Sequence, residues 1–223
     1  MKKALLIFLM LLSASSLAAQ NFSGGLLVGA EAQKSVRSWT FSVEGEIRAN
    51  QWVTRYDRGK IGADISFGCW QKRIKISAGY DYINKHDADN DAFYHRHRVN
   101  LSFGIGEKFG RFKLNYRARF QTNFYDIQRE SVRFNPKIYM RNRVELSYSI
   151  PHKDIKFFCS GEFFWRLYHP DKKIIDEVRA IVGMDYKVRK GHTLSFFLRS
   201  DNEVQVKNPE YALYLGIGYK FAR

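Results

Sequence analysis

The sequence predicts an all-β protein: a transmembrane, antiparallel, up-and-down β-barrel of ten to twelve strands. Three observations favour this fold class. Many segments alternate apolar and polar residues, a secretory signal stands at the N-terminus, and no later apolar run is long enough for a transmembrane helix. Because lipid offers the backbone no hydrogen-bond partners, only helices and closed barrels cross a bilayer. The barrel is therefore the membrane-spanning structure that fits this chain.

The clearest strand is Arg111–Gln121, in which side chains alternate across a pleated backbone. One face carries Phe112, Leu114, Tyr116, Ala118 and Phe120. The other carries Arg111, Lys113, Asn115, Arg117, Arg119 and Gln121. The polar face is too charged for an ordinary protein interior. We therefore expect the apolar face against lipid and the charged face in a wet lumen.

The first residues have the pattern of a cleaved signal. Lys2 and Lys3 precede the apolar run Ala4–Leu12, and a small-residue segment ending at Ala19 follows. A transmembrane anchor is disfavoured because about twenty apolar residues are needed to span a bilayer. We expect residues 1–19 to be a signal peptide, cleaved after Ala18 or Ala19, and residues 20–223 to form one outer-membrane barrel domain.

Ten further segments resemble the clearest strand. The first, Phe22–Gln33, alternates weakly and contains glycines. Four regular segments follow it: Trp39–Asn50, Arg58–Trp70, Ile74–Asn84 and Phe93–Gly106. Five more come after the clearest strand: Lys137–Ile150, Ile155–Tyr168, Glu177–Val188, Thr193–Glu203 and Tyr211–Phe221. Aromatic residues gather near the ends of these strands, where they suit a membrane interface.

Short turns alternate with longer polar loops along the chain. We expect short turns at 71–72, 107–110, 151–154 and 189–192 to face the periplasm. The loops near 85–92, 123–136, 169–176 and 204–209 should then face the outside. Eleven candidate strands conflict with the even number usual in bacterial barrels. Either Phe22–Gln33 lies outside the wall, giving ten strands, or a further strand is present, giving twelve.

The composition is basic, with 37 Lys and Arg against 22 Asp and Glu and a formal net charge of +15. Such an excess attracts nucleic acid or anionic lipid. Export makes nucleic acid a poor partner, so we expect outer-membrane lipid and lipopolysaccharide, together with an anion-attracting lumen. The predicted location is the outer membrane of a Gram-negative bacterium. The sequence indicates no oligomeric state.

Three stretches carry a family resemblance: Trp39–Arg48, His95–Arg98 and Gly110–Arg119. Together they resemble the uncharacterised outer-membrane family catalogued as domain of unknown function 2490, over nearly the whole mature chain. The resemblance implies a barrel and an outer-membrane location, but no known reaction. The last strand also resembles the assembly signal of outer-membrane proteins, although Ala222 and Arg223 follow its final aromatic residue. That similarity implies insertion by the barrel-assembly machinery.

Charged residues on the polar faces are the candidate site. We expect a lumen charge network of Glu44, Glu46, Arg48, Arg96, Arg98, Arg117, Arg119, Arg141, Arg143 and Glu145. Further acidic residues share these faces: Asp64, Asp81, Glu162, Glu177, Asp185, Asp201 and Glu203. The arginines either pair with carboxylates and fill the lumen, or form a constriction that attracts anions. The passive barrel, structural or a narrow pore, is the expected function.

The alternative function is an outer-membrane lipid-modifying hydrolase or acyltransferase with His95 or His97 as its base. No serine stands beside either histidine on the predicted strand, so no catalytic residue is assigned. A metal site from His86, Asp87, Asp91 and their neighbours has suitable residue types, but the segment lacks the glycine and the distal glutamate of a calcium loop. No metal or cofactor is expected. Cys69 and Cys159 are expected to remain unpaired on apolar faces.

Overall fold

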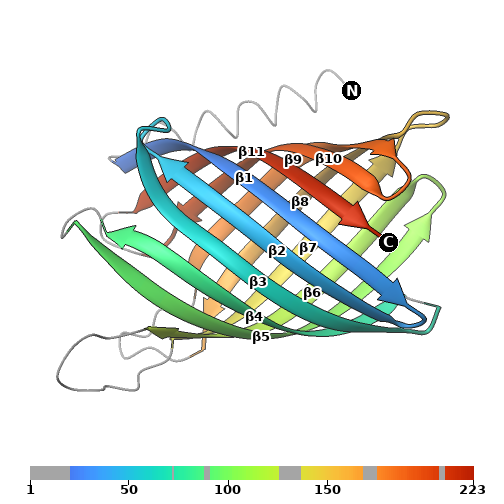
Figure 1. The fold of residues 1–223 in the computed structure, drawn as a ribbon, viewed down its shortest axis with the longest axis horizontal. Helices are drawn as coiled ribbons and strands as arrows, with labels where there is room; N and C mark the ends of the chain where they lie inside the picture. The colour runs from blue at the N-terminus through green and yellow to red at the C-terminus, as the bar shows by residue number, and fades with distance from the viewer. Residues whose placement is uncertain (1–20, 72, 88–90, 126–136, 168–174, 206–208) are drawn as a thin grey trace.

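Eleven strands form one closed barrel in the computed structural model (Figure 1). The structure describes residues 21–71, 73–87, 91–125, 137–167, 175–205 and 209–223, so the predicted signal peptide lies outside it. The strands are β1 (Asn21–Val36), β2 (Trp39–Asn50), β3 (Arg55–Cys69), β4 (Ile74–Asp87), β5 (Ala92–Phe109), β6 (Phe112–Tyr125), β7 (Lys137–Ser149), β8 (Ile155–Arg166), β9 (Ile175–Arg189), β10 (His192–Glu203) and β11 (Glu210–Ala222). Each corresponds to one of the eleven segments that alternate in sequence.

The barrel closes through a parallel pair. Sequence neighbours pair in antiparallel fashion, whereas β1 and β11 run in the same direction with Asn21 opposite Glu210 and Gln33 opposite Ala222. Figure 1 shows this pair at the front, in blue and red. An odd number of up-and-down strands necessarily brings the first and last together pointing the same way. The two expected counts, ten and twelve, were both wrong, because β1 belongs to the wall and a parallel pair completes it.

The connections at the two ends of the barrel differ in their range of length. At one end, here named the turn end, they have two to five residues, and β11 ends there; at the other, the loop end, they have four to eleven residues, and β1 begins there (Figure 1). Gly110 and Gly191 have φ of +61° and +81° in two of the turns, a conformation that glycine adopts without a Cβ clash. Because β5 continues to Phe109, the expected turn at 107–110 is displaced to residues 110–111. Parts of the predicted external loops, 88–90, 126–136, 168–174 and 206–208, lie outside the described residues, and which end faces the periplasm stays a prediction.

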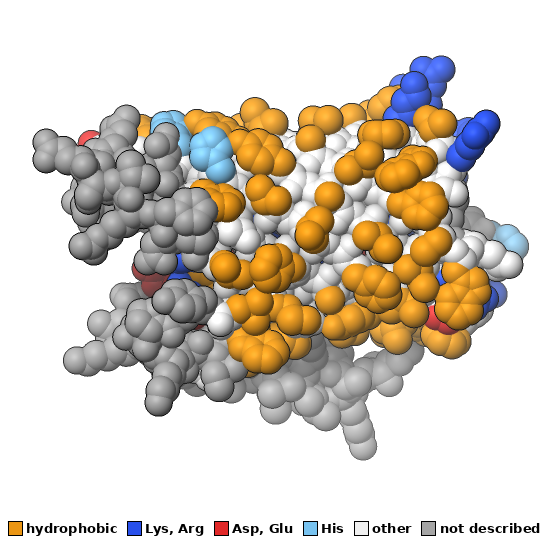
Figure 2. Space-filling model, turned by 90° about the horizontal axis from the view of Figure 1, so that it is seen from below, with side chains coloured by type: hydrophobic (Ala, Val, Ile, Leu, Met, Phe, Trp, Pro, Cys, Tyr) orange, Lys and Arg blue, Asp and Glu red, His pale blue; other side chains and the backbone are white. Residues whose placement is uncertain are grey.

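The outer face is apolar from strand to strand. On β5, for example, Val99, Leu101, Phe103 and Ile105 are all exposed on the outside. In Figure 2 hydrophobic side chains cover the middle of the visible face, and Lys and Arg side chains gather mainly towards its ends. Cys69 and Cys159 are free. An apolar exterior around a charged lumen is the arrangement of a membrane-spanning barrel, so the predicted fold class is confirmed. The described residues contain no helix long and apolar enough to cross a membrane.

One stretch of the lumen departs from the alternation. Leu27 of β1, Phe158 of β8, Ile181 of β9 and Phe197 of β10 point inwards and line a cavity of about 340 Å³. The Phe197 ring lies against Gly216 of β11, so that a Cβ at this glycine would approach a ring carbon to 2.1 Å. Consecutive side chains of a strand point to opposite faces. Because Phe157 faces outwards, the next residue, Phe158, points into the lumen.

Candidate functional site

The ten predicted network residues all line cavities of the lumen. They come from four strands: Glu44, Glu46 and Arg48 from β2, Arg96 and Arg98 from β5, Arg117 and Arg119 from β6, and Arg141, Arg143 and Glu145 from β7. Period-two alternation alone places them inwards, since the residues between them face outwards. Three of them, Arg48, Arg117 and Arg141, contact two carboxylates that lie on other strands.

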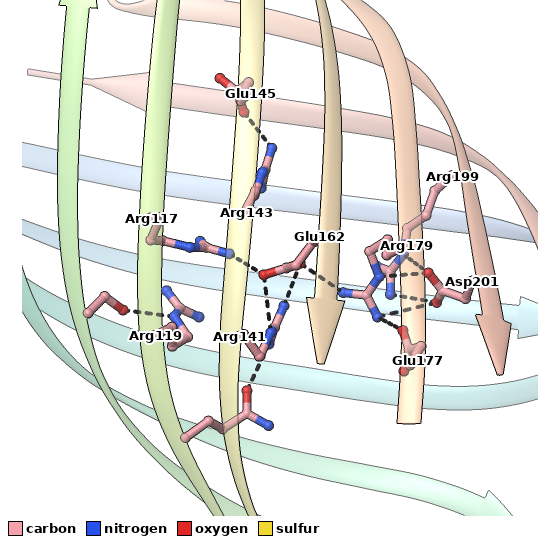
Figure 3. Close-up of polar contacts among 12 residues, drawn as sticks. Arg117, Arg119, Arg141, Arg143, Glu145, Glu162, Glu177, Arg179, Arg199 and Asp201 are labelled. Atoms are coloured by element: carbon pink, nitrogen blue, oxygen red, sulfur yellow. Dashed lines mark hydrogen bonds and ion pairs between the residues drawn. The ribbon is translucent and has the colours of Figure 1, made fainter. Parts of the chain in front are cut away.

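Glu162 of β8 is the first of these carboxylates. It is 4% exposed in its side chain and lies 2.8 Å from Arg117 Nη2 and 2.9 Å from Arg141 Nη2, with Arg179 Nη1 at 3.7 Å. Arg141 also donates from Nη1 to Gln121 Oε1 at 2.7 Å. One carboxylate therefore holds three arginines from three different strands (Figure 3).

Asp201 of β10 is the second centre. Its oxygens lie 2.6 Å from Arg179 Nε, 2.7 Å from Arg199 Nη2 and 3.4 Å from Arg48 Nη1. Because Arg179 contacts both Glu162 and Asp201, the two clusters form one group (Figure 3). We call this group the lumen network; it consists of Glu46, Arg48, Arg117, Arg141, Glu162, Glu177, Arg179, Arg199 and Asp201.

The lumen network also reaches across the closing pair of strands. Arg48 lies on β2 and Asp201 on β10, so their contact passes over β1 and β11. Phe164 packs beneath the guanidinium groups of Arg141 and Arg179, at 4.2 and 4.6 Å from its ring centroid. Ion pairs thus connect the strands on both sides of the point where the barrel closes.

The register places arginine opposite arginine on β6 and β7. Arg117 faces Arg143 and Arg119 faces Arg141. Like charges directly opposite each other repel, so these four arginines need carboxylates from a neighbouring strand or from elsewhere on β7. Glu162 serves Arg117 and Arg141, and Glu145 serves Arg143. Within the described residues Arg119 has no ion pair, and its Nε donates to Ser102 Oγ at 2.8 Å.

Two cavities divide the lumen. The turn-side cavity has a volume of about 640 Å³, and its lining carries seven basic and five acidic residues. The loop-side cavity has a volume of about 530 Å³, with thirteen basic and seven acidic residues in its lining. Arg117, Arg119 and Arg143, with Glu44 and Asp81, line both cavities and therefore lie where the two meet. The excess of positive charge is concentrated on the loop side.

The sequence pattern missed the centres of the network. Glu162 and Asp201 were expected among the carboxylates that pair with lumen arginines but not in the predicted network, and Arg179 and Arg199 were not selected. A signal was present, because Glu177 and Arg179 on β9, and Arg199 and Asp201 on β10, are opposite charges two residues apart on one strand face. Only the pairing register of the strands shows that each of the two carboxylates contacts three arginines.

The histidines of the alternative function face outwards. The Nδ1 atom of His97 lies 2.6 Å from Tyr80 Oη, and His95 pairs with Tyr82 in the same way, with the rings of His95 and Tyr82 stacked. Among the described residues their side-chain hydrogen-bond partners are tyrosines and include no serine. No group of three or more potential metal ligands occurs in the described part of the chain, while residues 88–90 of the acidic loop lie outside it.

Comparison with known proteins gives one family and several distant structures. The family model described as "Protein of unknown function (DUF2490)" matches residues 28–212. No curated protein has a significantly similar sequence. The beta domain of the Bordetella autotransporter BrkA is 10% identical, with 85% of this chain and 86% of that chain covered and a TM-score of 0.48. A chain from a structure described as "Unveiling the Mechanism Behind the in-meso Crystallization of Membrane Proteins" is 15% identical, with 88% and 82% covered and a TM-score of 0.34.

Proposed function

The chain belongs to the DUF2490 family of proteins of unknown function, and we propose that it is a passive outer-membrane barrel whose ion-paired arginines fill and brace the lumen. The observation that carries this proposal is the sharing of Glu162 and Asp201 by three arginines each. A buried charge is costly unless it is paired, so such a network holds its strands in one arrangement. The apolar exterior and the signal-like N-terminus support the outer membrane of a Gram-negative bacterium as its location.

The passage that remains beside the network should be narrow and should prefer anions. Rings of basic side chains lower the barrier for anions and raise it for cations. The loop-side cavity has this character, because basic residues outnumber acidic ones in its lining by almost two to one.

The expected partners are lipopolysaccharide around the apolar face and the barrel-assembly machinery during insertion.

Replacing Arg117 by Ala tests whether the network fills the lumen. We expect the free energy of unfolding to fall by roughly 1–3 kcal/mol, because Glu162 loses one of its charged hydrogen-bond donors. The heat-modification temperature on a gel should fall with it, while conductance in planar bilayers stays small. The reversal potential of the unaltered barrel in a salt gradient should favour chloride.

Lys153→Ala, in the exposed turn before β8, is the control and should change neither property. A large conductance in the unaltered barrel, or full thermal stability of Arg117→Ala together with weaker anion preference, would instead indicate a pore that the arginines line.

A further inference from the structure

We propose that the loop-side cavity binds small hydrophilic phosphate anions carrying two or more negative charges, held by Arg98 of β5 and Arg119 of β6. The inference rests on the proposed function, in that it requires a folded barrel whose lumen network leaves the loop-side cavity open, but it does not require conduction. It differs from general anion preference because it names a site and a class of ligand.

The two guanidinium groups are positioned by neutral partners. Arg98 Nε donates to Asn123 Oδ1 at 3.0 Å, and Arg119 Nε donates to Ser102 Oγ at 2.8 Å. These bonds fix the plane of each guanidinium and leave the terminal nitrogens for a ligand. Both side chains line the loop-side cavity, and Arg119 lines the turn-side cavity as well.

The carboxylates near these two arginines do not balance their charge. Arg119 has no ion pair within the described residues, and Arg98 Nη1 lies 3.6 Å from Asp81, beyond hydrogen-bond distance. Glu162 and Asp201 are already shared within the lumen network. Arg117 and Arg141 repel Arg119, and Arg141 also repels Arg98, while Asp81 attracts both and Glu162 attracts Arg119. The two carboxylates thus face a larger number of guanidinium groups, and a bound anion would offset the remaining repulsion.

The shape and lining of the cavity favour phosphate over an amphipathic anion. Guanidinium groups match phosphate oxygens with paired, charge-assisted hydrogen bonds. Among the described residues, Arg117 Nε, from the lining of the same cavity, is buried without a hydrogen-bond partner, so one donor is left over. A volume of about 530 Å³ accommodates a compact diphosphate with water. Leu27, Ile83 and Phe197 also line this cavity, but charged side chains make up most of its lining.

Calorimetry of the full barrel in detergent, titrated with sodium pyrophosphate at low salt, tests the proposal. We expect saturable binding of one pyrophosphate, weakened at least tenfold in Arg98→Gln and in Arg119→Gln. Ser102→Ala should also weaken binding, because it frees the Arg119 side chain without removing charge. Lys153→Gln should bind as the unaltered barrel does. Heat-modifiable migration of each variant verifies its fold, and Arg119 makes no ion pair with any described residue whose loss would prevent folding.

Three results would overturn the inference: no saturable binding, equal weakening in Lys153→Gln, or unchanged affinity in both arginine variants. Phosphatidic acid in the same micelles distinguishes a lipid headgroup from free phosphate, because it should not compete for a site within the lumen; competition would overturn the assigned location. The proposed function fails separately, through a large conductance of the unaltered barrel, whether or not pyrophosphate binds.

Discussion

Asp201→Asn should destabilise the barrel strongly, because this one carboxylate contacts three arginines of the lumen network. The substitution keeps the shape of the side chain but leaves Arg48, Arg179 and Arg199 facing one another without their shared carboxylate. Removing one partner of a buried ion pair typically costs about 3–5 kcal/mol. Urea unfolding of the reconstituted barrel, followed by heat-modifiable migration, should show a loss of this order.

Asp154→Asn is the matched control. Asp154 lies in an exposed turn, 3.9 Å from Lys187, and exposed ion pairs contribute at most about 1 kcal/mol. Its loss should leave the urea midpoint almost unchanged. If Asp201→Asn and Asp154→Asn had equal, small effects, the lumen network would not brace the barrel.

The second large effect is expected on the outer face. Leu101 lies in the middle of β5 and is 57% exposed, so an arginine there would face the centre of the bilayer. An arginine on the lipid face near the midplane costs roughly 2–4 kcal/mol. We therefore expect Leu101→Arg to reduce both the yield of folded barrel and its unfolding midpoint in lipid vesicles.

Phe109→Arg tests whether this cost depends on depth. Phe109 also faces outwards and is exposed, but it lies at the last position of β5, at the turn end. Near the interface the cost of arginine falls to roughly 0–1 kcal/mol. Equal tolerance of arginine at both positions would mean that lipid does not surround this face.

The strands and their faces could be predicted because alternation is local. About ten residues are enough to show which side chains of a strand point inwards and which point outwards. On β6, for example, Arg117 and Arg119 alternate with Tyr116, Ala118 and Phe120. The family resemblance agreed with this pattern, and the family model now matches residues 28–212. Fold class and membrane-facing side were therefore accessible without a structure.

Closure and register could not be predicted in the same way. Arg48 and Asp201 are 153 residues apart in sequence, and only the parallel pairing of β1 with β11 brings them together. The same holds for Arg119, which faces Arg141 across the strands and has no ion pair within the described residues. The strand count failed for a related reason, since it relied on the usual even number instead of on the pairing of the chain ends.

The central claim, that this barrel sits in lipid with its apolar face outwards, is tested most directly by the four tryptophans. All are exposed on the outside: Trp39 and Trp70 near the turn end, and Trp52 and Trp165 near the loop end. In vesicles of brominated phospholipid we predict strong quenching of tryptophan fluorescence, greater for bromines near the headgroup than at the chain ends, because the rings occupy the two interfaces. Quenching by aqueous iodide with no effect of brominated lipid would contradict the account.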